Sequence, residues 1–508
     1  MRPLFLLVLL IAVVCVSAIN LGKIRDFKKH IVEKIKNAAS KTKEKLKSIK
    51  DSFMAKIKDK MSALKSKIMK KLKPTKEQQE DLDKRMKNVT EIKHDHKNPN
   101  GDSIFDVNAN SDVASTLYQS DIMLSKSQAN DILEPERSKR QAFRDRNYPL
   151  TIWQTGVYFQ FHETAHPHMR EVFYKAATLW MNYTCIDFFE DDKAENRIII
   201  GKGQGCWSMI GRNGGIQELS LGEGCDNVGT ATHELGHALG FFHPMSRHDR
   251  DKFLTINIAT VRPDFVDQFN KESSQRNHNY GMTYDFGSIM HYGATSASPQ
   301  QKTTMVAYDT KYQRTMGSHL LSFLDLSMMN EHYKCKEKCP KSTSAQCKNG
   351  GFPNPRNCKI CICPSGFGGD VCDQRSPPGT KIEVQLGAIT QGYAYDGCVY
   401  GGVEIKTGED IALTGYRFCA PEDVGTTLTS ATNLVPYITF SRAGSFQSMI
   451  QFRMVGNGTY PEPPKDTAGK CLDTSNECEF MANGGFCQSP YYTDAFKKYL
   501  CAKSCKLC

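Results

Sequence analysis

Eleven residues beginning at His233 constrain this chain more than any other stretch, because they read H-E-x-x-H-x-x-G-x-x-H. Residues four apart lie on one face of a helix, so His233 and His237 can present imidazole nitrogens to one metal ion. Gly240 lets the backbone leave the helix, and His243 can then return as a third ligand. Three neutral imidazoles and an open position are typical of catalytic zinc. Glu234 is placed to accept a proton from water without binding the metal itself.

A histidine string of this kind also occurs on ordinary surface helices, so other motifs have to support it. Residues 288–292 read S-I-M-H-Y, and a methionine turn after such a string is typical of metzincin zinc proteases. Residues 232–237 read T-H-E-L-G-H, and residues 247–251 read R-H-D-R-D. Together these motifs resemble the astacin family of metzincins. The resemblance implies an α+β protease domain, one Zn²⁺ per chain and hydrolysis of peptide bonds within proteins.

The resemblance also assigns roles by position. The zinc ligands would be His233, His237 and His243, with Glu234 as general base and Met290 packed beneath the metal. Tyr292 would be an extra phenol ligand that swings off zinc to stabilise the oxyanion of the tetrahedral intermediate, although a tyrosine here can also be an ordinary core residue. One position departs from the family. The Glu that usually follows the third His and helps to hold the mature N-terminus is Pro244 here.

The N-terminal residues 1–18 predict a secretory signal. They have a basic start at Arg2, an apolar run too short to span a bilayer, and small residues before a cleavage point. Since no later apolar run approaches 18 residues, we expect a secreted, extracellular product without a stable membrane anchor. Glycosylation acceptors at Asn88, Asn182 and Asn457 agree with secretion.

The formal net charge of +11 comes from one segment. Residues 21–73 carry 19 Lys or Arg and 5 Asp or Glu, so the rest of the chain is slightly acidic. A nucleic-acid role for the mature protein is therefore not expected. Apolar residues recur every three or four positions from Leu46 to Leu72, which predicts an amphipathic helix with a lysine face. This helix could lie on an anionic membrane, pair with another helix, or be a solvated part of a discarded segment.

Residues 19–140 are predicted to be a pro-segment. Residues 137–140 read R-S-K-R, which favours cleavage by a proprotein convertase after Arg140 and a mature start at Gln141. Residues 117–122 resemble the astacin pro-segment motif F-x-G-D, in which the Asp occupies the open zinc position. Asp121 is accordingly the candidate latency ligand, and the Gly of that motif is Ser120 here.

The protease domain is expected over residues 141–335. Strand-like runs at 153–161 and 197–201 flank a helical pattern at 169–182, which predicts a sheet half, then the zinc helix, then a less regular half. In the family an extended substrate pairs with the edge strand of that sheet. The resemblance implies the disulfides Cys185–Cys335 and Cys206–Cys225. Arg250 and Asp251 are expected to form a structural salt bridge.

Eighteen of the 19 cysteines follow residue 180, and only Cys15 would leave with the signal. An even number in an oxidising compartment predicts nine disulfides. Residues 336–373 resemble an EGF-like module, which implies the pairs Cys339–Cys358, Cys347–Cys361 and Cys363–Cys372. The C-x-x-C-x-C run at 358–363 could instead hold a metal through thiolates.

Alternating strand patterns around Cys398 and Cys419 resemble the second half of a CUB domain over residues 380–456, which implies a β-sandwich with this one cysteine pair. The first half of a CUB domain is not visible, so the module is either truncated or built differently. Residues 471–508 resemble a ShK-like module, which implies the pairs Cys471–Cys508, Cys478–Cys501 and Cys487–Cys505. Lys498-Tyr499 matches a channel-blocking dipeptide of ShK toxins, but a docking or spacer role is more typical of secreted enzymes.

These observations predict a secreted zinc endopeptidase made as a latent zymogen, multidomain and acting on extracellular or matrix proteins. A second hypothesis, motivated by Pro244 and Ser120, is a weakly active zinc-binding protein that organises matrix or adhesion. A third is a membrane-active basic peptide released from residues 19–73.

Overall fold

The computed structural model describes residues 72–133, 142–143, 148–274, 276–365, 367, 369–373, 381–455, 472–473, 478–483, 487–488 and 494–507. All described residues belong to one compact unit, residues 68–508. Several predictions lie outside the described residues: the signal, almost all of the basic segment, the processing site at Arg140 and Gln141, Asn457 and the pair Cys471–Cys508. No helix within the described ranges is long and apolar enough to cross a membrane.

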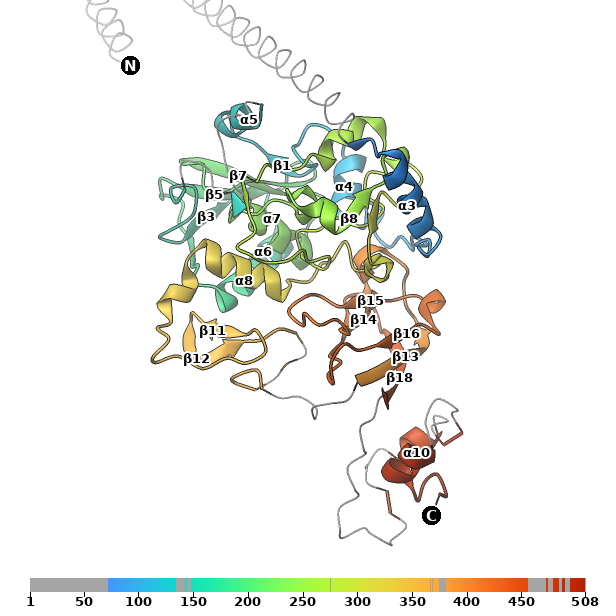
Figure 1. Ribbon diagram of the computed structural model, residues 1–508. Coiled ribbons are helices and arrows are strands. Elements are labelled where there is room, and N and C mark those ends of the chain that lie inside the picture. Colours follow the sequence, from blue (N-terminus) through green and yellow to red (C-terminus); the bar gives the residue numbers. More distant parts are fainter. Residues whose placement is uncertain are drawn as a thin grey trace, which may run out of the picture. The chain divides into compact units, whose positions relative to one another are not determined.

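A six-stranded mixed sheet spans residues 122–221, with strand order β1-β6-β7-β5-β3-β4 (Figure 1). Its strands are β1 (Ile122–Met123), β3 (Val157–Phe161), β4 (Phe188–Glu190), β5 (Arg197–Gly201), β6 (Cys206–Met209) and β7 (Ile216–Leu221). Only the β6–β7 pair is antiparallel. The strands predicted at 153–161 and 197–201 correspond to β3 and β5. β1 belongs to the segment before residue 140 that is expected to be a pro-segment, and this segment covers the β6 edge.

Two helices, α6 (Pro167–Tyr183) and α7 (Val228–Ala238), follow in the chain and pack against each other. α6 is the helix predicted at 169–182; Pro at its first turn and His166 as N-cap favour its start. Its buried face includes Met169, Phe173 and Trp180. The indole N–H of Trp180 donates to the Thr232 carbonyl at 3.1 Å.

The part that follows α7 has little regular structure, as predicted. It contains β8 (Leu254–Ile256) paired with β10 (Met305–Ala307), and α8 (Phe323–His332). Its β9 (Asn277–His278) pairs with β2 (Ala142–Phe143), which comes from the start of the domain. Short 3₁₀ helices connect them: Pro244–Ser246, Arg250–Lys252, Ile258–Thr260, Pro263–Phe269 and Thr310–Tyr312. The disulfides Cys185–Cys335 and Cys206–Cys225 form as the resemblance implied.

A three-disulfide module follows over residues 336–373, with β11 (Phe352–Asn354) paired with β12 (Asn357–Ile362). Its pairs are Cys339–Cys358, Cys347–Cys361 and Cys363–Cys372, so these sulfurs are not free thiolates for a metal. Arg356, in the turn between the strands, donates to the carbonyls of Met181, Thr184 and Ile186 at 2.7–2.8 Å. It therefore binds the carbonyl end of α6.

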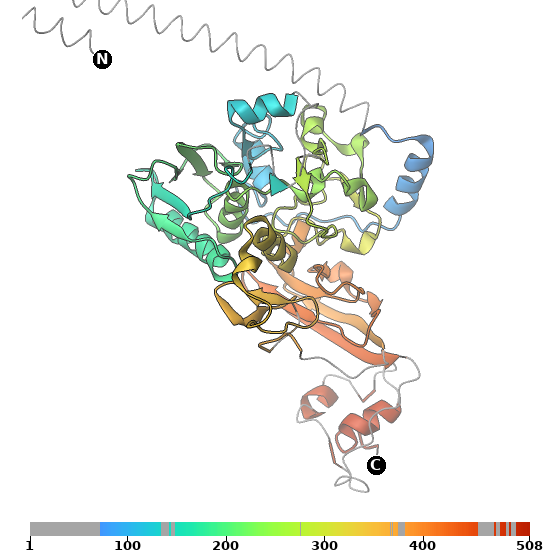
Figure 2. The ribbon, with the colours of Figure 1, turned by 60° about the vertical axis from the view of Figure 1, so that its left-hand side comes forward.

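The next module, which we call the sandwich (381–455), has two three-stranded antiparallel sheets, β16-β13-β18 and β15-β14-β17 (Figure 2). The strands are β13 (Lys381–Thr390), β14 (Gly401–Ile405), β15 (Tyr416–Phe418), β16 (Thr427–Thr429), β17 (Tyr437–Ser441) and β18 (Gln447–Val455). Both sheets contribute to one apolar core that includes Leu386, Val403 and Phe418. Cys398 pairs with Cys419.

The described part of the C-terminal tail contains α9 (Cys478–Asn483) and α10 (Asp494–Cys501). The disulfides Cys478–Cys501 and Cys487–Cys505 tie it together, as the resemblance implied. The Asp473 carboxylate accepts the backbone N–H groups of Lys503 and Ser504 at 2.9 Å.

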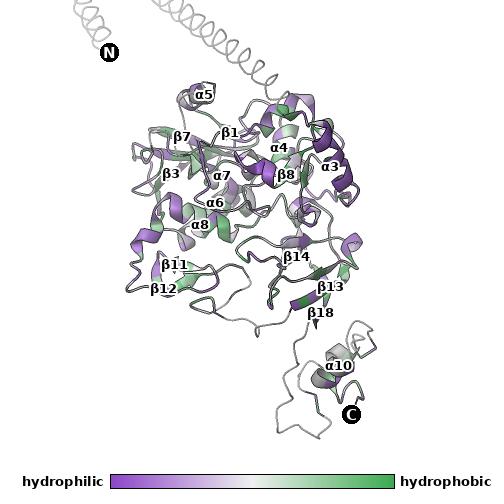
Figure 3. Cartoon of the chain, viewed as in Figure 1, coloured by the Kyte–Doolittle hydropathy of each residue, from purple (hydrophilic) through white to green (hydrophobic). Residues whose placement is uncertain are grey.

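The described part of the expected pro-segment, residues 72–133, has three helices, α3 (Lys76–Met86), α4 (Ile104–Asn110) and α5 (Lys126–Leu133). α3 is strongly hydrophilic (Figure 3) and starts with a capping box between Thr75 and Gln78. Its Arg85 donates to the Val306 carbonyl at 3.0 Å and to the Thr255 hydroxyl at 2.7 Å. These contacts hold α3 against β8 and β10.

Candidate active site

The zinc helix predicted from the histidine string is α7. It starts after Asn227, whose side-chain oxygen accepts the Thr230 N–H at 3.0 Å, and it is buried from Thr230 onward. The chain turns away at Gly240, where φ is +109°. A Cβ on Gly240 would lie 2.9 Å from Nε2 of His332, so both the backbone angle and the space require glycine.

The structure brings the three predicted ligands together. His233, His237 and His243 are all buried. Each Nδ1 has an acceptor: the Ile289 carbonyl at 2.7 Å for His233, the Phe241 carbonyl at 2.6 Å for His237, and Oε1 of Gln119 at 2.8 Å for His243. These bonds place the ring proton on Nδ1 and leave each Nε2 with a free lone pair. Burial lowers the pKa of His243 to about 3, which keeps its imidazole neutral.

Asp121 lies where the three Nε2 atoms converge. Its carboxylate oxygens are 3.1 Å from Nε2 of His233, 3.3 Å from that of His237 and 3.1 Å from that of His243. The Nε2 atoms of His233 and His243 are 3.3 Å apart. Ligands at the usual zinc–nitrogen distance of about 2.1 Å in a tetrahedron are separated by about 3.4 Å. The distance between these two Nε2 atoms therefore suits a tetrahedral zinc ion.

The polar atoms in this centre need a cation. Nε2 of His237 and Oδ1 of Asp121 are buried without a hydrogen-bond partner in the described structure. Lone pairs and a carboxylate that face one another repel unless a positive charge lies between them. The four groups can hold one metal ion, since their ligand atoms all lie within 4.8 Å of one another. This donor set fits Zn²⁺.

Glu234 follows the first ligand on α7 and is completely buried. Within the described chain, neither of its carboxylate oxygens has a hydrogen-bond partner. Burial, and then the Asp121 charge, raise the pKa of Glu234 well above its ordinary value. A buried carboxyl group without partners next to a metal centre is the arrangement expected of a general base that meets water only when the site opens.

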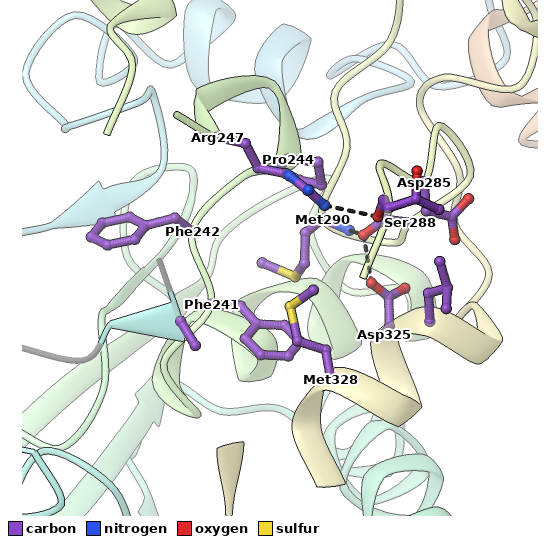
Figure 4. Close-up of a pocket in the computed structure, with 12 residues that line it drawn as sticks. Phe241, Phe242, Pro244, Arg247, Asp285, Ser288, Met290, Asp325 and Met328 are labelled. Carbon is purple, nitrogen blue, oxygen red and sulfur yellow. Dashed lines mark hydrogen bonds between the residues drawn. The ribbon is translucent and has the colours of Figure 1, made fainter. Parts of the chain in front are cut away.

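The methionine turn is anchored from α8, where Asp325 faces Ser288 (Figure 4). The Asp325 carboxylate accepts the Ser288 hydroxyl at 2.5 Å and the Ile289 N–H at 2.8 Å. The Met290 sulfur would lie 2.5 Å from a Cβ added to Gly236, so Met290 packs tightly beneath the zinc helix. Burial, and then Asp285, raise the pKa of Asp325 to about 6.

Tyr292 follows Met290 by two residues and reaches the centre. Its hydroxyl donates to Oδ2 of Asp121 at 2.6 Å and also lies 2.9 Å from the Gln119 carbonyl. Burial, and then Asp121, raise the pKa of Tyr292 well above its ordinary value, so the phenol remains a donor. The hydroxyl is thus directed into the zinc site and does not end in the core.

The pro-segment reaches the centre through a strained turn. Gln119 and Ser120 have φ of +51° and +74°, so Ser120 adopts the left-handed backbone that a glycine would adopt more easily. This costs roughly 1–2 kcal/mol. Asn108 offsets it by donating to the Ser120 carbonyl at 2.9 Å. The Ser in place of Gly therefore does not redirect the chain away from zinc.

The sequence analysis missed two residues of this site, Gln119 and Glu272. Gln119 binds His243 and also donates to Glu272 at 3.0 Å, and Glu272 accepts the Tyr118 hydroxyl as well. Gln119 stands two positions before Asp121, which was a usable signal. Glu272 lies more than 150 residues away from both partners, and no motif marks it.

The other positions singled out from the sequence lie around the centre. Pro244 begins a 3₁₀ helix directly after His243 and lines a small cavity together with Arg247 (Figure 4). Arg250 and Asp251 form the expected salt bridge at 3.0 Å. The acceptors Asn88 and Asn182 are both exposed.

Comparisons with known proteins agree with this geometry. Residues 145–334 match the family described as Astacin (Peptidase family M12A), and residues 470–508 match the ShK domain-like family. Zinc metalloproteinase nas-31 of Caenorhabditis elegans is 44% identical over 459 residues, which cover 80% of this chain and 75% of the relative. Zinc metalloproteinase nas-29 of the same organism is 36% identical, with 66% and 72% covered.

A solved structure, the hatching enzyme zinc-protease high choriolytic enzyme 1 from Oryzias latipes, is 30% identical with a TM-score of 0.33 and covers 35% of this chain and 88% of its own. The relatives and the family matches decide the assignment. This chain belongs to the astacin family and is a zinc metalloendopeptidase.

Proposed function

We propose that the chain is a secreted endopeptidase made as a latent zymogen, and that it cleaves extracellular or matrix proteins after its pro-segment is removed. The observation that supports latency most directly is Asp121, whose carboxylate lies against all three histidine Nε2 atoms. The pro-segment also occupies the edge of β6, where the Ser208 N–H donates to the Asp121 carbonyl at 3.1 Å. Both the metal centre and the substrate edge are therefore blocked by the same segment.

The mechanism follows from the residues that remain when the pro-segment leaves. The three imidazoles would hold zinc, which would supply Lewis acidity toward a peptide carbonyl and lower the pKa of water. Glu234 accepts the proton of the attacking water and passes it to the leaving amine. The Tyr292 hydroxyl, freed from Asp121, donates a hydrogen bond to the carbonyl oxygen as negative charge develops there. The β6 edge, freed from β1, can bind an extended substrate backbone.

Latency can be tested in the chain beginning at residue 19, with Arg140→Ala to prevent cleavage. We expect the Asp121→Asn variant of this chain to hydrolyse a quenched peptide library. The neutral Asn amide binds zinc more weakly than the Asp carboxylate and should no longer block the open position. Asp112→Asn, an exposed position in the same segment, serves as the matched control and should remain latent. Equal latency of both variants would contradict the role of Asp121.

Catalysis and metal dependence are tested on the 141–508 form. Hydrolysis of the same library should disappear after zinc chelation and return with added zinc. If correctly disulfide-bonded, zinc-loaded protein cleaves nothing, the alternative of a weakly active zinc-binding matrix protein is favoured, and Pro244→Glu is the first variant to examine.

The accessory modules are proposed to select where the enzyme acts. An EGF-like module at 336–373, a CUB-like sandwich and a ShK-like tail are typical of extracellular proteins, and cleavage after Arg140 by a proprotein convertase would take place on the secretory route. Deletion of residues 456–508 tests the tail. Unchanged cleavage of candidate matrix proteins by the shortened enzyme would contradict a targeting role for it.

A further inference from the structure

The pro-segment has a second set of contacts, on the sandwich and away from zinc. Tyr393, Tyr395 and Tyr400 gather with Val399 in one cluster, which we call the tyrosine face. The hydroxyl of Tyr395 donates to the Asp106 carboxylate. The tyrosine face thus supplies a hydrogen-bond donor to an aspartate of the pro-segment.

Two more aspartates of the pro-segment bind the same face. The Tyr400 hydroxyl donates to Asp102. Asp95 accepts the Ala394 N–H at 2.8 Å, and its own N–H donates to the Ala394 carbonyl at 3.0 Å. Hydrogen bonds from neutral donors to carboxylates are stronger than those between neutral groups. The carboxylates of Asp95, Asp102 and Asp106 therefore all accept hydrogen bonds from one surface.

Two basic residues lie near the face, Arg442 of the sandwich and Lys97 of the pro-segment. The backbone N–H of Arg442 donates to the Tyr400 carbonyl at 2.8 Å. Its guanidinium lies 2.7 Å from Nδ1 of His319. Burial lowers the pKa of Arg442, and the Asp102 charge opposes this shift. Lys97 of the pro-segment places its ammonium 3.8 Å from the centre of the Tyr393 ring.

The face is fixed relative to the catalytic centre. Asp396, next to Tyr395, accepts the Thr295 N–H at 3.1 Å, only three residues after Tyr292. The Thr414 hydroxyl of the sandwich donates to Asp285 at 3.1 Å. These buried contacts attach the sandwich directly to the half of the protease that carries the methionine turn.

The pro-segment runs continuously from the tyrosine face into the active site. Ile104, two residues after Asp102, lines a pocket together with His233 and Tyr292. Asp121 then lies at the zinc ligands. A chain bound in the active site can therefore extend to the tyrosine face along a path that this protein already uses.

We propose that the tyrosine face is an exosite for aspartate-bearing segments of protein substrates, masked by residues 94–106 in the latent chain and open once the pro-segment leaves. This inference rests on the proposed function, because it requires that the pro-segment is released. It identifies a substrate class, namely proteins with an acidic stretch beside the cleavage site. A tethered acidic stretch raises the effective concentration of the scissile peptide at the zinc centre.

The test uses the 141–508 form and two quenched substrates with the same cleavable peptide and a flexible Gly/Ser linker. One substrate ends in the sequence of residues 92–110. The other carries Asn at positions 95, 102 and 106 of that tail. We expect the Asp tail to lower KM at least tenfold relative to the Asn tail, with kcat unchanged, because the exosite changes binding and not the chemical step.

Enzyme variants locate the effect. In Tyr395→Phe/Tyr400→Phe the advantage of the Asp tail should nearly vanish, while hydrolysis of the untailed peptide stays normal. Tyr437→Phe, an exposed tyrosine on β17, is the matched control and should keep the advantage. Equal KM for both tails on the wild-type enzyme, or an unchanged advantage in the double variant, would overturn the exosite. If the double variant does not fold, the comparison of KM for the Asp and Asn tails on the wild-type enzyme still tests the exosite.

Failure of the proposed function would look different. If no substrate is hydrolysed, fluorescence anisotropy of a labelled 92–110 peptide still reports binding to the 141–508 form. Binding that is lost with the Asn peptide would support the tyrosine face as an acidic-segment site even without activity. Equal binding of the Asp and Asn peptides would overturn it.

Discussion

Two buried glutamates show how differently the zinc helix and the sandwich use the same side chain. Glu234 on α7 has 0% of its surface exposed and Glu404 on β14 has 5%. Glu404 accepts the Gly415 N–H at 3.0 Å and pairs with Nε of Arg417 at 3.1 Å. Glu234 has no hydrogen-bond partner among the described residues.

A buried carboxylate is tolerated at low energy only when its oxygens are paired. Glu404 is paired and holds β14 to β15. Glu234 keeps its hydrogen-bonding capacity for a molecule that enters the site. At these two positions, the unpaired buried carboxylate serves chemistry and the paired one serves structure. The same Glu→Gln change should therefore have opposite consequences at the two positions.

Glu234→Gln should give the largest effect. We expect hydrolysis by the 141–508 form to fall about 10⁴-fold, because the amide cannot accept the proton of the attacking water. The thermal transition should not move downward, since no hydrogen bond is lost. Glu218→Gln, at an exposed position on β7, should remain fully active. Substantial activity in Glu234→Gln would assign the proton transfer to another group.

Glu404→Gln should invert this pattern. The change leaves the buried Arg417 cation without its anionic partner, and breaking a buried ion pair costs about 3 kcal/mol or more. Urea unfolding should show the sandwich transition at a clearly lower midpoint, while zinc content and kcat of the folded enzyme stay normal. An unchanged midpoint would show that the Gly397 carbonyl, which accepts from Arg417 at 3.2 Å, stabilises the buried guanidinium without Glu404.

Tyr292→Phe tests a residue whose hydroxyl pairs with Asp121 and would be free under the proposed removal of the pro-segment. We expect kcat to fall roughly 10²-fold with little change in KM, because one donor to the developing oxyanion is removed. Zinc content should equal that of the wild type. A matching fall in zinc content would instead make Tyr292 a structural support of the centre.

Asp325→Asn should give the smallest effect and depends on pH. A folded-state pKa of about 6 lies above the unfolded value near 3.9, so the folded state binds the proton more tightly. This contribution is fully present below about pH 4 and is lost as pH rises through 6, by at most 2–3 kcal/mol. In metal-free protein, the decline of the urea midpoint between pH 4 and 6.5 should be shallower in the variant. Identical slopes would mean that Asp325 does not titrate in this range.

The local part of the site could be predicted from the sequence, because helix geometry fixes it. The spacing of His233 and His237, the turn at Gly240 and the return of His243 follow from properties of a few adjacent residues. Cysteine spacing, together with family resemblance, likewise anticipated every disulfide within the described residues.

The long-range contacts could not be predicted. Glu272 joins the pro-segment turn across more than 150 residues, and Asp396 reaches Thr295 across 101. Neither acidic residue stands in a pattern that distinguishes it from a solvated one. The two sheets of the sandwich also needed the structure, because β13 pairs with β18 at the far end of the module.

Arg356 has a consequence for where this protein can be divided. Cysteine spacing places a module boundary just after Cys335, yet the last carbonyls of α6 find their donors in the guanidinium of Arg356, which also pairs with Asp187 at 2.5 Å. A helix end whose carbonyls lose their donors must recruit water or fray. A protease shortened to end at Cys335 would thus carry a loosened helix beneath its zinc site. The catalytic unit, in the sense of autonomous folding, extends beyond the catalytic sequence.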